Sequence, residues 1–438
     1  MRLYVRHLFI VMLVGGYFFD YPLLQAVSLF LYSGAVLTED TRAGTLRRLD
    51  VSTTFAFLLL LTSFSHFGAL SGWFDTGDTW ANYLIPEHLE KGLFVFSAGA
   101  VVSMEAMRYT MVSRGDYRIA YPRQSFFVSV LLVSLMLLVA RHFGLLPSWG
   151  TVTSFVQLLV NGSIFLLAYM AHAENRMARI ITVVVYSTGL SLYAIQFSYL
   201  RMEIIVPWLA YFMGEVVARR QILRIHLVSK TILVVGLVVF PVLFTYLGKN
   251  RESLRGSERK LELALKEGTG LPRDEEGETL LSRLNVMGQM SNIVDLTERK
   301  GFYEGFTLRY FSFVFIPRFI WPEKPILDGG QWFAVEIGRS YYLPSGRAAN
   351  SVNMTVPGEM YLNFGWSGLI AGCTLFGFFV SFIWNSVRGS DLISWAFRFY
   401  LLFLGMFSLG SDMMVIPQLM AYWLIYKTVT FFRTRLYA

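Results

Sequence analysis

The chain alternates long apolar stretches with short polar connections over most of its length. A helix that crosses a bilayer needs about 20 mostly apolar residues. Stretches of this kind predict about twelve membrane-spanning helices, at residues 4–19, 22–38, 53–72, 89–108, 125–144, 149–172, 178–195, 200–217, 229–247, 356–384, 391–410 and 413–431. The pattern therefore indicates an all-α polytopic membrane protein.

One long polar segment, residues 249–355, interrupts this alternation. It divides the chain into a transmembrane region at 1–248 with about nine spans, the polar segment itself, and a second transmembrane region at 356–438 with about three spans. A compact protein rarely carries so long a connection without structure or function. We therefore expect the segment to hold much of the functional chemistry.

The polar segment is expected to be partly helical. Residues 251–267 mix opposite charges at helical spacing, and residues 280–300 begin with apolar side chains at i, i+4 and i+7. Residues 302–321 are aromatic and apolar but are interrupted by charges and a proline. Such a stretch is typical of an interfacial or re-entrant helix.

Composition supports the membrane assignment. Of 438 residues, 55% are hydrophobic and 16% are charged, with a mean hydropathy of +0.49, whereas a soluble domain carries about a quarter charged residues. The net charge of +8 is spread through short loops without a basic tail or binding module, so we expect no nucleic-acid partner. The single cysteine, Cys373, lies in an apolar run, and no Cys/His cluster has metal-ligand spacing.

The basic residues also predict an orientation. Cytoplasmic loops carry the excess of Lys and Arg, and alternate loops here are consistently arginine-rich: Arg42, Arg47, Arg48, Arg108, Arg114, Arg118, Arg123, Arg176, Arg179, Arg219, Arg220, Arg224, Lys230 and Arg388. The other short loops hold only Lys91, Arg141 and Arg201. Both termini are therefore expected in the cytoplasm, with the polar segment outside.

Five basic residues of the polar segment are candidates for binding an anion: Arg309, Arg318, Lys324, Arg339 and Arg347. Arginine presents a planar fork of donors that suits phosphate, so several arginines on an aromatic, membrane-proximal surface would suit a lipid-linked pyrophosphate. The alternative is ordinary headgroup anchoring, or pairing with nearby acidic residues.

Two further ionisable residues lie at predicted helix ends. Arg201 is a candidate because an ionisable residue at membrane depth is functional by default, although an interfacial arginine can also snorkel outward. Glu359 follows Pro357 at the start of a predicted span. Its carboxylate would serve either as a general base toward a sugar hydroxyl or as a stabiliser of the helix N-terminus.

Asp75 and Asp78 lie in an outer loop. They would bind a metal, act as the base of a polyprenyl-phosphate-sugar transferase, or lie in a solvated turn.

Two sequence blocks carry a family resemblance. The blocks are IPRFIWPEKP (316–325) and PGEMYLNFGWSG (357–368), with Gly330, Phe333 and Gly338 between them. With them the chain resembles the Wzy-type polysaccharide repeat-unit polymerases, which include the O-antigen polymerases of bacterial envelopes. That family is similar in having about a dozen spans, cytoplasmic termini and a long, late periplasmic loop, and it resembles metal-independent glycosyltransferases of the C-type fold.

The resemblance implies an enzyme of the bacterial inner membrane. It would transfer a growing glycan from one undecaprenyl pyrophosphate to the non-reducing end of a lipid-linked repeat unit at the periplasmic face. Its partners would be undecaprenyl-pyrophosphate-linked glycans, membrane lipids and a chain-length-regulating co-polymerase. No metal and no cofactor are expected, because arginines would supply the positive charge.

The expected site combines three kinds of side chain. Glu359 is the candidate base. The residues expected to bind pyrophosphate are Arg201, Arg318, Arg339 and Arg347. The residues expected to contact sugar or lipid are Trp321, Lys324, Trp332 and Trp366.

Two alternatives share the broad fold: an O-antigen ligase, which attaches finished polymer to a lipid core, and a polyprenyl-phosphate-sugar glycosyltransferase. A third alternative is a polysaccharide or lipid transporter. Transporters place charged or broken-helix elements near the bilayer midplane, whereas the polar residues of this chain lie toward one surface.

Overall fold

The structure is a computed structural model of the 438-residue chain. It describes residues 2–42, 50–73, 84–111, 124–145, 150–197, 201–219, 229–231, 285–314, 316, 320–321, 329–342, 346, 348, 351–387, 392–407, 413 and 415–436.

The described residues form helices and connecting turns. They contain no strand, and a single isolated bridge joins Tyr342 to Ala348. The helices are α1 (Arg2–Phe18), α2 (Pro22–Arg42), α3 (Val51–Leu70), η2 (Pro86–His88), α5 (Leu89–Thr110), α6 (Gln124–His142), α7 (Gly150–Ala173), α8 (Met177–Phe197), α9 (Arg201–Arg219), α13 (Met287–Lys300), η4 (Phe306–Tyr310), α14 (Phe311–Val314), α15 (Gly329–Glu336), α16 (Val356–Ser386), α17 (Leu392–Phe407) and α18 (Val415–Leu436).

Within the described ranges, five helices are long and apolar enough to cross a membrane. They contain the stretches Val51–Leu70, Ser125–His142, Val156–Ala173, Met177–Ile195 and Val356–Ser386. Helix α6 exposes Val128, Leu132 and Met136 at i, i+4 and i+8. Such a continuous apolar face on the outside of a protein marks contact with lipid or another apolar surface. The chain is therefore an all-α protein with the helices of a membrane protein.

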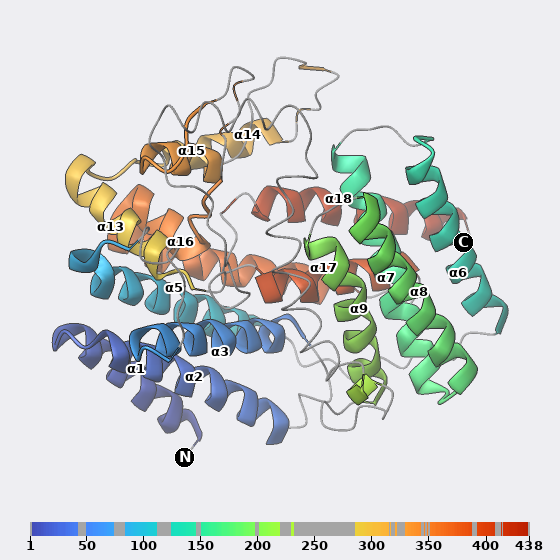
Figure 1. The fold of residues 1–438 in the computed structure, drawn as a ribbon, viewed down its shortest axis with the longest axis horizontal. Coiled ribbons are helices and arrows are strands. Elements are labelled where there is room, and N and C mark those ends of the chain that lie inside the picture. Colours follow the sequence, from blue (N-terminus) through green and yellow to red (C-terminus); the bar gives the residue numbers. More distant parts are fainter. Residues whose placement is uncertain are drawn as a thin grey trace.

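The helices form two groups that α17 connects (Figure 1). Helices α1, α2, α3 and α5 lie together, with α16 packed against α5, while α6, α7, α8 and α9 form the second group. Helix α17 packs against both α7 and α3. A Cβ on Gly162 of α7 would collide with Ala396 of α17, so a glycine is needed where these two backbones meet.

Helix α16 is kinked at Gly365, which has φ 63° and ψ −147°. That region of backbone conformation is open essentially to glycine alone. The part before the kink, beginning at the Thr355 N-cap, is buried in protein from Val356 to Asn363. The predicted span at 356–384 therefore corresponds to one element, Val356–Ser386, whose two helical parts meet at the kink at Gly365.

Part of the predicted outer segment belongs to the core. Helix α13 lies against α5 and α16 and buries Met290, Ile293 and Val294. The aromatic stretch predicted as one interfacial helix at 302–321 instead contains the short helices η4 and α14. Together with α15 they lie at the edge of the molecule beyond α13 (Figure 1).

Candidate functional site

Glu359 lies in the first turn of α16 and is 1% exposed. Its carboxylate accepts hydrogen bonds from the Thr307 hydroxyl at 2.5 Å and from the Met413 backbone N–H at 2.5 Å. The side-chain cap of the helix is Thr355, whose hydroxyl accepts from Gly358 N–H at 3.1 Å. Glu359 therefore joins α16 to η4 and to the connection between α17 and α18.

Backbone and amide groups complete this joint. The Asn363 amide donates to the Thr307 hydroxyl at 2.7 Å and to the Glu359 carbonyl at 2.8 Å. Since the kink at Gly365 frees the preceding carbonyls from the helix, Leu362 O accepts from Tyr303 N–H at 3.0 Å and Asn363 O accepts from Glu304 N–H at 2.9 Å. This enclosure favours a positioning role for Glu359, because a general base must reach a substrate proton.

Trp332 lies in an aromatic cluster of the polar segment at 249–355. Its ring is 5.1 Å from that of Tyr303 and 5.4 Å from that of Phe306, between centroids. The Arg309 guanidinium lies 3.7 Å from the centroid of Phe306, a cation–π contact. Arg309 and the rings of Phe306, Tyr303 and Trp332 thus lie close together.

An ionic pair adjoins this cluster. The Glu336 carboxylate accepts from Lys300 at 2.5 Å and from the Tyr303 hydroxyl at 2.9 Å. The hydrogen bond from Lys300 lowers the pKa of Glu336. Burial, followed by the hydrogen bond to Glu336, raises the pKa of Tyr303, so this phenol stays protonated as a donor.

The other predicted tryptophans lie elsewhere. Trp366 contacts Tyr361 at 5.2 Å and Phe94 of α5 at 5.7 Å, and Trp321 contacts Phe313 at 5.5 Å. The three tryptophans therefore do not share one surface cluster.

The other predicted polar residues lie at the ends of α15 and α9 or outside the described residues. Arg339 follows α15 and is partly exposed, with its backbone N–H bonded to Ala334 O at 2.7 Å. Arg201 begins α9, and its side chain is outside the described set. Also outside the described residues are Arg318, Lys324, Arg347, Asp75 and Asp78.

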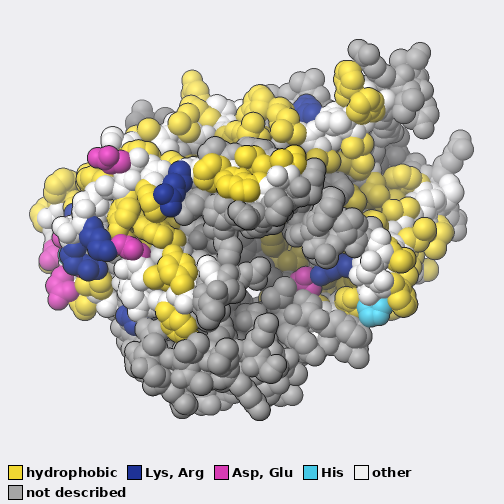
Figure 2. Space-filling view, turned by 90° about the horizontal axis from the view of Figure 1, so that it is seen from above, with side chains coloured by type: hydrophobic (Ala, Val, Ile, Leu, Met, Phe, Trp, Pro, Cys, Tyr) yellow, Lys and Arg dark blue, Asp and Glu magenta, His cyan; other side chains and the backbone are white. Residues whose placement is uncertain are grey.

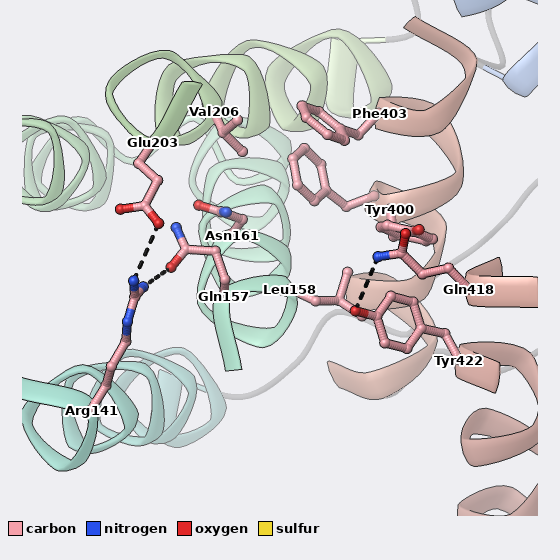
Figure 3. A pocket seen from close by; sticks show the side chains of 11 residues that line it. Arg141, Gln157, Leu158, Asn161, Glu203, Val206, Tyr400, Phe403, Gln418 and Tyr422 are labelled. Carbon is pink, nitrogen blue, oxygen red and sulfur yellow. Dashed lines mark hydrogen bonds and ion pairs between the residues drawn. The ribbon is translucent and has the colours of Figure 1, made fainter. Parts of the chain in front are cut away.

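A cavity of about 260 Å³ lies between α6, α7 and α9 of the second helix group and the C-terminal helices α17 and α18 (Figure 3). Its walls come from the end of α6, the middle of α7, the start of α9, the middle of α17 and the first turns of α18. Figure 2, seen from the side of α14 and α15, shows mostly hydrophobic side chains on the described part of this face, with basic and acidic side chains gathered mainly at one side. The cavity is lined by Arg141, Gln157, Leu158, Asn161, Glu203, Val206, Phe399, Tyr400, Phe403, Gln418 and Tyr422.

The polar wall of the cavity is centred on Arg141. Its guanidinium pairs with Glu203 at 3.2 Å and donates to the Gln157 side-chain carbonyl. On the other side, the Gln418 amide donates to the Tyr422 hydroxyl at 3.4 Å (Figure 3). The cavity thus combines an ion pair, amides and aromatic rings.

The cavity and the hydrogen-bonded Glu359 both have contacts at or just before the start of α18. Met413, which donates to Glu359, lies two residues before α18, and Gln418 lines the cavity from the first turns of that helix. Arg201 begins α9 two residues before Glu203. The two regions therefore lie at neighbouring helix ends.

The cavity residues were not among the predicted site residues. A signal was present for Gln157 and Asn161, because they are polar, four residues apart and within an apolar run, which places them on one helix face. Arg141 and Glu203 were visible only as isolated charges, and their pairing depends on the packing of α6 against α7 and of α7 against α9.

Within the described residues, no three His, Cys, Asp or Glu side chains gather in a way that could hold a metal ion. Comparisons with protein-family models, curated proteins and solved structures found no match to this chain.

Proposed function

We propose that this protein is a membrane glycosyltransferase that polymerises undecaprenyl-pyrophosphate-linked repeat units at the periplasmic face of the bacterial inner membrane. The observation that carries the proposal is the cavity between α6, α7, α9, α17 and α18, where a carboxylate, an arginine and aromatic rings converge. Pockets between helices of a bundle with a few convergent polar groups are the default candidates for substrate sites. The resemblance to Wzy-type polymerases agrees with this chemistry.

The distribution of Lys and Arg in the loops supports a periplasmic location for the proposed site. The two charged residues of the cavity, Arg141 and Glu203, lie near helix ends that the loop arginines predict to be periplasmic. The proposed architecture has about twelve spans, a C-type fold and cytoplasmic termini.

In the proposed reaction, an acceptor hydroxyl oxygen bonds to the anomeric carbon of the donor glycan. The bond from that carbon to the pyrophosphate oxygen breaks, and undecaprenyl pyrophosphate leaves with the electron pair. Arg201, Arg318, Arg339 and Arg347 stabilise the leaving group. Because these arginines supply the positive charge, we expect activity to persist in the presence of EDTA.

We propose that the Glu203 carboxylate accepts the proton that the acceptor hydroxyl releases. Glu203 lines the cavity and its side chain is 18% exposed, whereas Glu359 is buried and holds Thr307 and Met413. In this proposal Glu359 positions the outer segment relative to α18.

The proposal is tested with purified protein in nanodiscs and lipid-linked repeat units as substrate. Wild-type protein is expected to produce a ladder of polymer, and Glu203→Gln is expected to lower the initial rate by about 10²–10⁴-fold, the usual contribution of a general base. Glu174→Gln is the matched control, because Glu174 pairs with Arg179 at the opposite end of α7, with a similarly enclosed side chain. The control is expected to keep the wild-type rate.

Other products would identify another function. Transfer of finished glycan to a lipid core without repeat addition would indicate a ligase. Movement of substrate across vesicle membranes without a new glycosidic bond would indicate a transporter. A wild-type rate for Glu203→Gln would contradict its assigned role.

A further inference from the structure

The described lining of the cavity is electrically balanced. Its charged residues are Arg141 and Glu203, and they pair with each other. A second nitrogen of the Arg141 guanidinium donates a hydrogen bond to the Gln157 side chain. A site for pyrophosphate needs uncompensated positive charge, so this cavity suits an uncharged ligand.

Asn161 supplies the most specific feature of the cavity. It is 4% exposed, and its side-chain Oδ1 has no hydrogen-bond partner among the described residues. Figure 3 shows Asn161 beside Gln157 on the wall that faces Glu203. A buried acceptor without a donor destabilises a protein, and such an atom in a native fold calls for an explanation. A hydroxyl group of a ligand would satisfy it.

Aromatic rings form the opposite wall. Tyr400, Phe403 and Tyr422 line the cavity from α17 and α18. Flat apolar rings facing amides and a carboxylate match a pyranose, which has C–H faces and a rim of hydroxyls.

We propose that this cavity is a subsite for one uncharged sugar ring, with Asn161 Oδ1 accepting a hydrogen bond from a ring hydroxyl. Resting on the proposed function, the ring is the terminal sugar of the acceptor repeat unit. Its reacting hydroxyl faces Glu203, while the pyrophosphate of the donor binds outside this cavity. The subsite thereby assigns the acceptor half of the reaction to α6, α7, α9, α17 and α18.

Binding is measured by saturation-transfer difference NMR on the full chain in nanodiscs, with methyl glycosides of glucose, galactose, mannose and N-acetylglucosamine as probes. We expect a signal for at least one probe, no displacement by inorganic pyrophosphate, and an affinity about tenfold lower in Asn161→Leu, the effect of losing about one hydrogen bond. Ser163→Ala is the control, because Ser163 is two residues away on α7, is buried and bonds to Leu159 O. It is expected to bind like the wild type.

Thermal unfolding separates binding from structure. Because Asn161→Leu removes an unsatisfied buried acceptor, its Tm is expected to equal or exceed that of the wild type. Val206→Phe fills the cavity from α9 and leaves Asn161 intact, so it is expected to lose the glycoside signal as well.

Three results would overturn the subsite: no signal for any probe, displacement of the glycosides by pyrophosphate, or unchanged binding in both Asn161→Leu and Val206→Phe. These outcomes are separate from the failure of the proposed function. Glycoside binding without polymer synthesis would keep the subsite and refute the polymerase, whereas polymer synthesis with unaltered kinetics in both variants would refute the subsite alone.

Discussion

At the scale of single residues, the environment of a carboxylate decides what it can do. Glu359 and Glu203 lie at the starts of α16 and α9. The first is fully enclosed by hydrogen-bond donors, and the second shares a cavity with an arginine. The sequence alone leaves Glu359 open between base and helix stabiliser, because its partners come from distant segments.

Glu359→Gln is expected to destabilise the protein by about 1–3 kcal/mol, since it weakens hydrogen bonds to a buried carboxyl group and places an amide donor beside the Met413 N–H. The measurement is thermal unfolding in nanodiscs. Thr307→Val, which removes the other donor, is expected to be non-additive with it in a double-mutant cycle. An unchanged Tm together with complete loss of transfer would instead establish Glu359 as the base.

At the scale of elements, the kink in α16 determines how the outer segment attaches. Gly365 turns the helix, and the freed carbonyls of Leu362 and Asn363 receive the chain at Tyr303 and Glu304. The apolar run predicted the ends of α16 within a few residues but could not predict the kink. The reason is that the run stays apolar through Gly365, while the bend depends on partners more than fifty residues away.

Gly365→Ala is expected to lower stability by about 1–3 kcal/mol, because an alanine would be strained at φ 63° and its Cβ would lie 2.8 Å from Phe302. Gly189→Ala in α8 is the control, since a Cβ there meets nothing within 4 Å. The control is expected to be neutral or slightly stabilising in the same unfolding measurement, because alanine favours a helix. Equal Tm values for the two variants would show that the kink carries no strain-sensitive contact.

At the scale of the whole molecule, the class of fold follows from local properties of the sequence, whereas the cavity does not. Apolar length is a local property, so the predicted span at 53–72 became α3 at Val51–Leu70, and the span at 178–195 became α8 at Met177–Phe197. The cavity collects residues from Arg141 to Tyr422, and only packing brings them together.

The proposed orientation predicts which ends of α7 face the periplasm. With the buried Cys373 replaced by alanine, Phe143→Cys before α7 is expected to react with an impermeant maleimide in intact spheroplasts. Met177→Cys after α7 is expected to react only after lysis, because Arg176 and Arg179 favour the cytoplasmic side. Both positions are exposed, so accessibility to water-soluble reagent is the difference being measured. The opposite labelling pattern would reverse the orientation and place the cavity toward the cytoplasm.

The bond between Glu359 and Met413 also sets an order for biosynthesis. The donor is 54 residues further along the chain than the carboxylate, which corresponds to several seconds of translation at roughly 5–20 residues per second. During that interval Glu359 has been synthesised while one hydrogen-bond donor to its buried carboxyl group has not yet been made. The start of α16 can therefore settle into its final place only after the connection to the last helix emerges. Nascent chains that stop before this point would retain an incompletely satisfied carboxylate, a chemical mark by which unfinished molecules differ from finished ones.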